Sequence, residues 1–194
     1  YWHILESRLF DNTGFASRRA TRKFIKEIIE YDPDVILLHN IHGYYINIEI
    51  LFEYIKSANK KVVWTLHDCW AFTGHCSHFS YVSCDKWRTG CNKCPQKKCY
   101  PKSIGGDLSR KNYVRKKRLF TGIEDMTIQT PSEWLKQLVV QSFLGEYKVV
   151  VVPHTVDEDI FHPVKSDIKS ILGIEKKKMI LGVASAWQER KGLY

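Results

Sequence analysis

The sequence lacks several features that would place it in familiar classes of protein. It has no run of about 18 apolar residues, so no membrane-spanning helix is expected within it. No basic, apolar, small-residue stretch marks a secretory signal peptide. No Gly-x-Gly-x-x-Gly follows a strand-like segment, which argues against a dinucleotide-dependent enzyme. Low-complexity tracts and internal repeats are missing as well, which leaves an ordinary folded protein.

The two ends of the sequence indicate a piece of a longer chain. It begins at Tyr1 rather than Met, and it ends at Gly192-Leu193-Tyr194, directly after a strand-like segment. We therefore expect further residues at both ends. With 194 residues, of which 44% are hydrophobic and 13% aromatic, the chain is long enough to bury a sizeable core.

Helix-like and strand-like patterns alternate along the chain. Apolar residues recur at helical spacing from near Ser17 to Asp32 and from Ile48 to Asn59. Short apolar runs predict five strands, at residues 34–39, 61–66, 126–130, 147–152 and 178–184. This alternation predicts a Rossmann-like α/β fold, in which a parallel sheet has helices on both faces. The first run is typical of a strand that is buried on both faces.

Residues 68–120 interrupt the alternation and are predicted to form an insertion. The segment is too long for an ordinary connection between two strands. Its first half holds five cysteines and five aromatic residues, which argues against disorder. Its second half contains Ser109–Phe120, which is predicted to be a helix with Tyr113 and Phe120 on a narrow apolar side.

Polar residues gather where the predicted strands end. The first four strands run into His39-Asn40, His67-Asp68, Thr130-Pro131-Ser132 and Pro153-His154. Open parallel sheets bind ligands beyond the carboxyl ends of their strands. Histidine at three of these four ends therefore predicts a polar crevice. At the third end, Thr130 is predicted to be the N-cap of the next helix, with Glu133 completing a capping box.

The positive charge is concentrated in one segment. Residues 86–118 contain twelve Lys or Arg and a single acid, Asp107, whereas the whole chain has a formal net charge of +9. Such a patch suits phosphate, nucleic acid or an anionic lipid surface. The simpler alternative is a solvated helix face beside a loop.

Four cysteines of the insertion predict a structural zinc site. They are Cys76, Cys84, Cys91 and Cys94, with seven, six and two residues between successive members. Two intervening residues let the last pair reach the same ion. Cys99, His75 or His78 are candidates to replace one ligand. Disulfides and buried free thiols remain as alternatives.

The order of several motifs resembles a known enzyme family. The motifs are residues 32–43 (DPDVILLHNIHG), 65–68 (TLHD), 130–135 (TPSEWL), 152–157 (VPHTVD) and 184–193 (ASAWQERKGL). In this order they are similar to family 4 glycosyltransferases of bacterial surface-polysaccharide pathways. The resemblance extends along nearly the whole chain.

The resemblance implies two Rossmann-like domains that face each other across a cleft. Residues 1–155 would form the N-terminal, acceptor-side domain, and residues 156–194 would form the linker and the start of the nucleotide-sugar-binding domain. The implied reaction moves a sugar from a nucleotide sugar to a saccharide or lipid-linked acceptor, with retention of anomeric configuration. Because most of the second domain would lie beyond Tyr194, we expect this segment to be inactive alone.

The resemblance also implies roles for individual residues. His67 matches the cleft histidine that contacts the donor sugar and is the predicted catalytic residue. The predicted substrate-binding residues are His39, Asn40, His42 and Asp68, with Asp68 orienting His67 or receiving an acceptor hydroxyl. Arg190 and Lys191 match the basic pair that binds the donor phosphates. The family's usual arginine would lie near Ala186, so Arg190 is expected to take its place.

The expected partners are a nucleotide sugar, a saccharide or lipid-linked acceptor and an anionic membrane surface. No cofactor is expected for catalysis, and zinc is expected only as a structural ion. The protein is expected in the cytoplasm, peripherally on the inner face of the membrane. The alternative function is a zinc-knuckle nucleic-acid-binding module that uses the basic patch 86–118. Buried parallel strands with histidines at their carboxyl ends argue against it, because that architecture builds clefts for small ligands.

Overall fold

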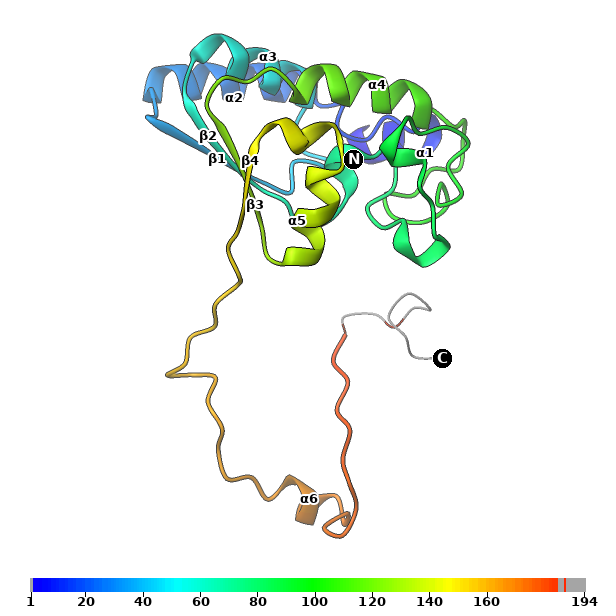
Figure 1. The fold of residues 1–194 in the computed structure, drawn as a ribbon, viewed down its shortest axis with the longest axis vertical. Coiled ribbons are helices and arrows are strands. Elements are labelled where there is room, and N and C mark those ends of the chain that lie inside the picture. Colours follow the sequence, from blue (N-terminus) through cyan, green and yellow to red (C-terminus); the bar gives the residue numbers. More distant parts are fainter. Residues whose placement is uncertain (1, 185–186, 188–194) are drawn as a thin grey trace. The chain divides into compact units, whose positions relative to one another are not determined.

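The computed structural model describes residues 2–184 and 187. The chain divides into two compact units, Tyr1–Pro153 and His154–Tyr194, and each unit is described by itself. The elements of the first unit are α1 (Trp2–Phe10), α2 (Arg18–Tyr31), β1 (Val35–His39), α3 (Ile48–Ala58), β2 (Lys61–Thr65), the 3-10 helices η1 (Trp70–Phe72), η2 (Ser80–Val82) and η3 (Lys86–Arg88), α4 (Ser109–Phe120), β3 (Met126–Thr130), α5 (Glu133–Val140), η4 (Phe143–Glu146) and β4 (Lys148–Val151) (Figure 1).

Four parallel strands form the sheet, in the order β1-β2-β3-β4. The predicted α/β architecture, a parallel sheet flanked by helices, is therefore confirmed. Two rows of buried side chains cross the sheet in register: Ile36, Val62 and Met126, then Leu38, Trp64 and Ile128. In Figure 1 the helices α2, α3 and α4 lie together in one layer beside the sheet. None of the helices in the described residues has the length and apolar character of a membrane-spanning segment.

Aromatic side chains join the helix layer to the sheet. Phe52 of α3 and Phe120 of α4 both pack against Trp64 of β2, with ring centroids 5.4 and 4.9 Å from the Trp64 ring. The two phenylalanine rings lie 4.5 Å apart, and all three side chains are buried. Burial of each such side chain contributes about 1.5–3 kcal/mol to folding. This cluster fixes β2, and with it the residues that follow β2.

The prediction that residues 34–39 are buried on both faces is wrong. Buried and exposed residues alternate along β1, and Val35 and Leu37 are 42% and 66% exposed. β1 lies at the edge of the sheet, and its outward-pointing side chains face solvent. Within the described part of the chain, the face of β1 that carries Val35 and Leu37 is therefore left without a covering helix.

Most predicted helix boundaries agree with the structure. Ser17 precedes α2, and Asp32 ends it with a positive φ of 49°. Asn59 ends α3 in the same left-handed conformation, with φ 49°. Both residue types tolerate this region better than most because their short polar side chains bond locally. α4 has the predicted bounds, Ser109–Phe120, with Tyr113 and Phe120 buried.

The predicted capping box at α5 is wrong by two residues. Ser132, not Thr130, is the N-cap, and its Oγ accepts a hydrogen bond from the Leu135 N–H at 3.3 Å. Thr130 still ends β3, and its Oγ1 donates to the Ser132 carbonyl at 3.2 Å. Glu133 is therefore the first residue of the helix and not the third.

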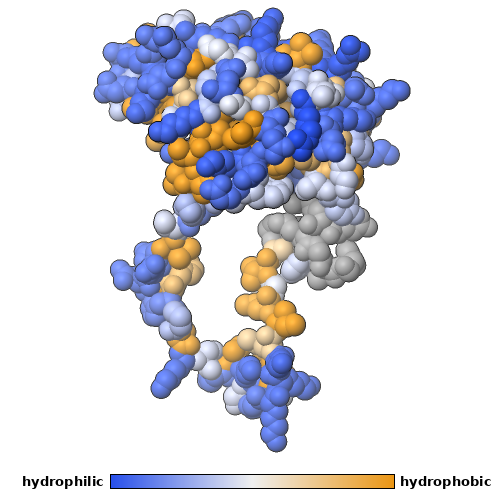
Figure 2. Space-filling view, in the orientation of Figure 1, coloured by the Kyte–Doolittle hydropathy of each residue, from blue (hydrophilic) through white to orange (hydrophobic). Residues whose placement is uncertain are grey.

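The second unit contains one short helix, α6 (Ile168–Ile171), among its described residues. The predicted strand at residues 178–184 is wrong, because the segment has no strand neighbour among the described residues. Ile180, Leu181 and Val183 are 98%, 78% and 86% exposed, and Figure 2 shows apolar surface along this segment. A parallel strand requires a hydrogen-bonded neighbour, which an apolar run alone does not supply.

The insertion at residues 68–120 shares the core of the first unit. Its side chains Trp70, Phe72, Phe79, Trp87 and Phe120 are buried in the same cluster as the sheet. Residues 69–99 contain only the three short 3-10 helices η1 to η3. The cysteine-rich half of the insertion is therefore held by side-chain packing rather than by a helix or a strand ladder.

The position of the α5 cap predicts the effect of one substitution. Ser132→Ala is expected to lower the free energy of unfolding by about 1 kcal/mol, because the Leu135 N–H loses its acceptor. Ser132→Asn keeps a capping oxygen and is the control. Urea unfolding of both variants measures the difference. Equal stability of Ser132→Ala and the wild-type protein would contradict this cap.

Candidate functional site

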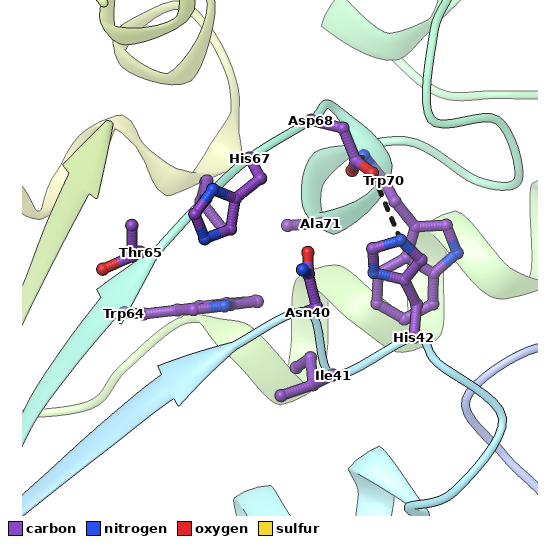
Figure 3. Close-up of a pocket in the computed structure, with 10 residues that line it drawn as sticks. Asn40, Ile41, His42, Trp64, Thr65, His67, Asp68, Trp70 and Ala71 are labelled. Atoms are coloured by element: carbon purple, nitrogen blue, oxygen red, sulfur yellow. Dashed lines mark hydrogen bonds and ion pairs between the residues drawn. The ribbon is translucent and has the colours of Figure 1, made fainter. Parts of the chain in front are cut away.

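A cavity lies at the carboxyl ends of β1 and β2, where the sequence predicts a polar crevice. Its volume is about 10 Å³, and ten residues line it (Figure 3): Asn40, Ile41, His42, Trp64, Thr65, Leu66, His67, Asp68, Trp70 and Ala71. Four of the five predicted substrate-site residues thus line one cavity, and the fifth, His39, bonds to one of them. The parallel topology explains this, because the carboxyl ends of neighbouring parallel strands lie at the same edge of a sheet.

A sharp turn after β1 places Asn40 and His42. Asn40 has a positive φ of 43°, and its carbonyl accepts from the Gly43 N–H at 3.2 Å. Asparagine adopts this conformation more readily than most residues. The turn lets the Asn40 amide and the His42 ring both approach the residues that follow β2 (Figure 3).

His42 and Asp68 form a partly buried pair. His42 Nε2 lies 3.2 Å from Asp68 Oδ2, and the side chains are 9% and 16% exposed. Asp68 Oδ1 accepts from the Trp70 N–H at 2.8 Å. The His42 ring stacks on the Trp70 ring, with centroids 5.0 Å apart and planes 20° apart. Asp68 thus orients His42, a contact that the sequence does not predict; its predicted roles, orienting His67 or receiving an acceptor hydroxyl, stay predictions.

The environment of Asp68 favours its ionised form. Burial alone raises the pKa of its carboxyl, but the hydrogen bond and charge of His42 and the Trp70 N–H outweigh burial and lower that pKa below its usual value. Asp68 is therefore a carboxylate near neutral pH. Its contacts with His42 and Trp70 give it a supporting role in the wall of the cavity.

His39 and His67 form a second pair at the mouth of the cavity. His39 Nδ1 lies 3.1 Å from His67 Nε2, and the rings stack with centroids 5.5 Å apart. Both residues are exposed. A hydrogen bond between two imidazoles needs one N–H and one lone pair, so at least one of the two rings is neutral. His67 is thereby held in one orientation while its ring stays accessible to a ligand.

Lys116 lies behind the cavity, and sequence analysis missed its role. The sequence places it in the surface patch 86–118, yet it is 1% exposed. Its Nζ donates to the Trp70 and Thr73 carbonyls at 2.8 and 3.2 Å and lies 3.3 Å from the Trp70 ring centroid. Burial lowers the pKa of Lys116 to about 7. Lys116 comes three residues after Tyr113 and four residues before Phe120, which puts it on the apolar side of the helix. This spacing was the sequence signal that could have predicted its burial.

A buried acid–histidine pair joins the N-terminal segment to the insertion. His75 Nδ1 lies 2.5 Å from Asp11 Oδ1, and both side chains are 1% exposed. Asp11 Oδ2 accepts from the Leu108 N–H at 2.8 Å. Among the described residues, His75 Nε2 is buried without a hydrogen-bond partner. No sequence pattern indicated this pair, because its members are 64 residues apart.

The four cysteines predicted to bind zinc lie around a second cavity. All six thiols are free, and the cavity is lined by Cys76, Cys84, Cys91 and Cys94 together with Phe79, Trp87 and four other residues. The Cys76 thiol donates a hydrogen bond to the Cys94 sulfur, which lowers the pKa of Cys94 to about 7. Burial raises the pKa of Cys91 to about 11. Within residues 2–184 and 187, no three His, Cys, Asp or Glu side chains are already arranged as a metal-binding group.

The basic patch is less available than the sequence suggests. Arg115 and Arg118 both approach the Glu49 carboxylate, at 3.5 and 3.4 Å. Lys116 is buried. Arg110, Lys111 and Lys117 are exposed on α4. The predicted phosphate-binding pair, Arg190 and Lys191, lies outside the described residues.

Sequence comparison relates the chain to a segment of a known protein. It is 36% identical over 124 residues to the protein named "Putative colanic acid biosynthesis glycosyl transferase WcaC" of Escherichia coli strain K12. The aligned region covers 61% of this chain and 28% of WcaC, so the chain spans only about a quarter of that relative's length. No family model matches the chain, and no solved structure matches it. The chain is thus similar to a segment of a protein named as a glycosyl transferase of polysaccharide biosynthesis.

The Asp68 carboxylate predicts a pH-dependent contribution to stability. Asp68→Asn is expected to lower the free energy of unfolding by about 1–2 kcal/mol near neutral pH, because a charge-assisted pair is lost. The folded-state pKa is below the unfolded value of about 3.8, so this contribution is fully present above about pH 4 and is lost as the pH falls through the folded-state pKa.

Urea unfolding at about pH 7, 5 and 3 measures this difference. Asp85→Asn is the control, because the Asp85 side chain is 82% exposed and its removal is expected to have little effect at any pH. A difference between wild type and Asp68→Asn that is the same at all three pH values would contradict the assignment of a lowered pKa.

Proposed function

We propose that this chain is part of a retaining glycosyltransferase of surface-polysaccharide synthesis. The enzyme moves a sugar from a nucleotide sugar to a saccharide or lipid-linked acceptor. The observation that carries the proposal is the convergence of His39, Asn40, His42, His67 and Asp68 at the carboxyl ends of β1 and β2. The similarity to WcaC supports it. Membership of family 4 and a domain boundary at residue 155 remain predictions.

In this proposal His67 contacts the donor sugar. Its ring is exposed at the mouth of the cavity and is oriented by His39. Cleavage of a glycosyl–phosphate bond develops positive charge at the sugar ring, and polar groups fixed in advance stabilise that charge without reorganising. The exposed Asn40 amide is placed to bind a sugar hydroxyl on the acceptor side. His42 and Asp68 support the wall behind these residues.

The leaving group of the proposed reaction is a nucleoside diphosphate. It requires positive charge, which Arg and Lys supply through charge-assisted hydrogen bonds. Arg190 and Lys191 are assigned this role by their position in the ASAWQERKGL motif. The role therefore rests on the sequence resemblance alone.

The structure weighs against the alternative of a nucleic-acid-binding module. Aromatic stacking platforms must be exposed, yet Trp70, Phe72, Phe79 and Trp87 of the insertion are buried. Three of the patch cations are engaged within the protein, as Lys116 is buried and Arg115 and Arg118 face Glu49. The exposed cations of α4 instead suit a lipid surface, where a lipid-linked acceptor would lie.

The proposed function predicts a loss of activity in His67→Ala. In the full-length protein we expect kcat to fall by about 10²–10³, as happens when one preorganised polar group is removed from a charged transition state. Release of nucleoside diphosphate from a panel of UDP-, GDP- and dTDP-linked sugars, with a lipid-linked saccharide as acceptor, measures the rate. The control is His162→Ala, an exposed histidine of the second unit. If the kcat of His67→Ala equals that of the wild-type protein, His67 has no part in the mechanism.

The exposed cations of α4 predict binding to anionic membranes. The triple variant Arg110→Gln, Lys111→Gln and Lys117→Gln is expected to reduce vesicle binding by about 100-fold, at about 1 kcal/mol for each charge. Co-sedimentation with vesicles of phosphatidylcholine and phosphatidylglycerol at low salt measures the change. The matched control removes three exposed cations of α2, Arg19, Arg22 and Lys26. Equal losses in both variants would show that only net charge matters, and would refute an α4 surface.

A further inference from the structure

Four thiols from three separate stretches of the insertion face one small cavity. Cys76 follows η1, Cys84 lies between η2 and η3, and Cys91 and Cys94 follow η3. The volume of the cavity is about 10 Å³, which is about one water molecule. A single ion fits such a space.

Aromatic side chains pack beside this cavity. Phe79 and Trp87 stack with centroids 4.9 Å apart, and Phe72 packs on the edge of Trp87 at 5.5 Å. All three side chains are buried. Residues 69–99, however, have no α-helix or strand. A bond network among the four cysteines would give this segment the cross-links that its backbone lacks.

Two buried basic side chains lie beside the thiols. Lys116 is 1% exposed and close to Cys91 and Cys76. His75 is 2% exposed and close to Cys94, with its Nε2 unpartnered among the described residues. Basic side chains near cysteine sulfurs favour the thiolate, which is the form that binds a metal ion. The nearby buried acid, Asp11, binds His75 Nδ1 and the Leu108 N–H.

We propose that Cys76, Cys84, Cys91 and Cys94 bind one Zn²⁺ ion in this cavity. Four thiols release four protons, four Zn–S bonds of about 2.3 Å form, and the centre carries a net charge of −2. Lys116 lies near Cys91 and Cys76, and His75 lies near Cys94. Soft thiolate ligands in a tetrahedral set favour zinc over harder divalent cations. The two residues between Cys91 and Cys94 let both sulfurs reach the same ion.

Binding requires the thiols to turn toward the centre of the cavity. The Cys76 thiol now donates to the Cys94 sulfur, and no three donors among the described residues are yet in metal-binding geometry. Loss of the thiol protons removes this hydrogen bond, and both sulfurs then become metal ligands. This movement is a local rotation of side chains that already line the same cavity.

Elemental analysis of the purified protein, without a metal-binding tag, tests the proposal. We expect about one zinc per chain, released when a mercurial reagent modifies the thiols. Replacement by Co²⁺ is expected to give the intense visible bands of a tetrahedral thiolate complex. Neither readout depends on glycosyltransferase activity, so failure of this proposal is distinguishable from failure of the proposed function.

Variants assign the ligands. Cys91→Ser and Cys94→Ser are expected to lose the zinc, whereas Cys99→Ser, which changes an exposed thiol outside the cavity, is expected to keep it. Wild-type protein that holds no zinc after incubation with Zn²⁺, with either six free thiols or disulfides in its place, would overturn the proposal. Iron in place of zinc would overturn it too. These wild-type measurements stand even where a variant fails to fold.

Discussion

The contacts of the buried Lys116 side chain are the interactions on which both cavities depend. Its Nζ donates to two carbonyls of the turn after β2, at Trp70 and Thr73, and lies over the Trp70 ring. A buried amino group that loses its hydrogen-bond partners costs about 1–3 kcal/mol, so α4 and this turn are bound to move together. Trp70 carries the stacked His42 ring. Thr73 Oγ1 donates to the Cys76 carbonyl at 2.6 Å. One side chain therefore couples the histidine cavity to the cysteine cavity.

The aromatic core extends this coupling to the sheet. Phe120 contacts Trp64 of β2 and also lies 6.5 Å from the Trp70 ring. Trp64 lines the histidine cavity and also packs against Phe52 in the core. A change in the packing of α4 would therefore reach the cavity by two routes, through the sheet at Trp64 and through the turn at Trp70. The insertion is part of the structure that positions the candidate site.

The sequence predicted which residues lie at the strand ends better than it predicted the partners of those residues. Strand ends at His39 and His67 follow from apolar runs, and parallel topology then brings the two together. The partner of Asp68 did not follow, because only the turn at Asn40 decides that His42 meets it. The burial of Leu37 was mispredicted for a similar reason. An apolar run predicts a strand, but whether a strand is central or at an edge depends on neighbours that the run does not encode.

The exposure of the site residues divides their roles. His39, Asn40 and His67 are exposed and so can contact a ligand directly. His42 and Asp68 are largely enclosed, with their polar atoms committed to each other and to the Trp70 N–H. Breaking that pair would leave a buried polar group unsatisfied. The enclosed pair thus resists rearrangement and keeps Trp70 in place, while the His39 and His67 rings are accessible at the mouth of the cavity. Under the proposed function, this division puts a rigid pair behind the cavity and the side chains that would contact a sugar at its mouth.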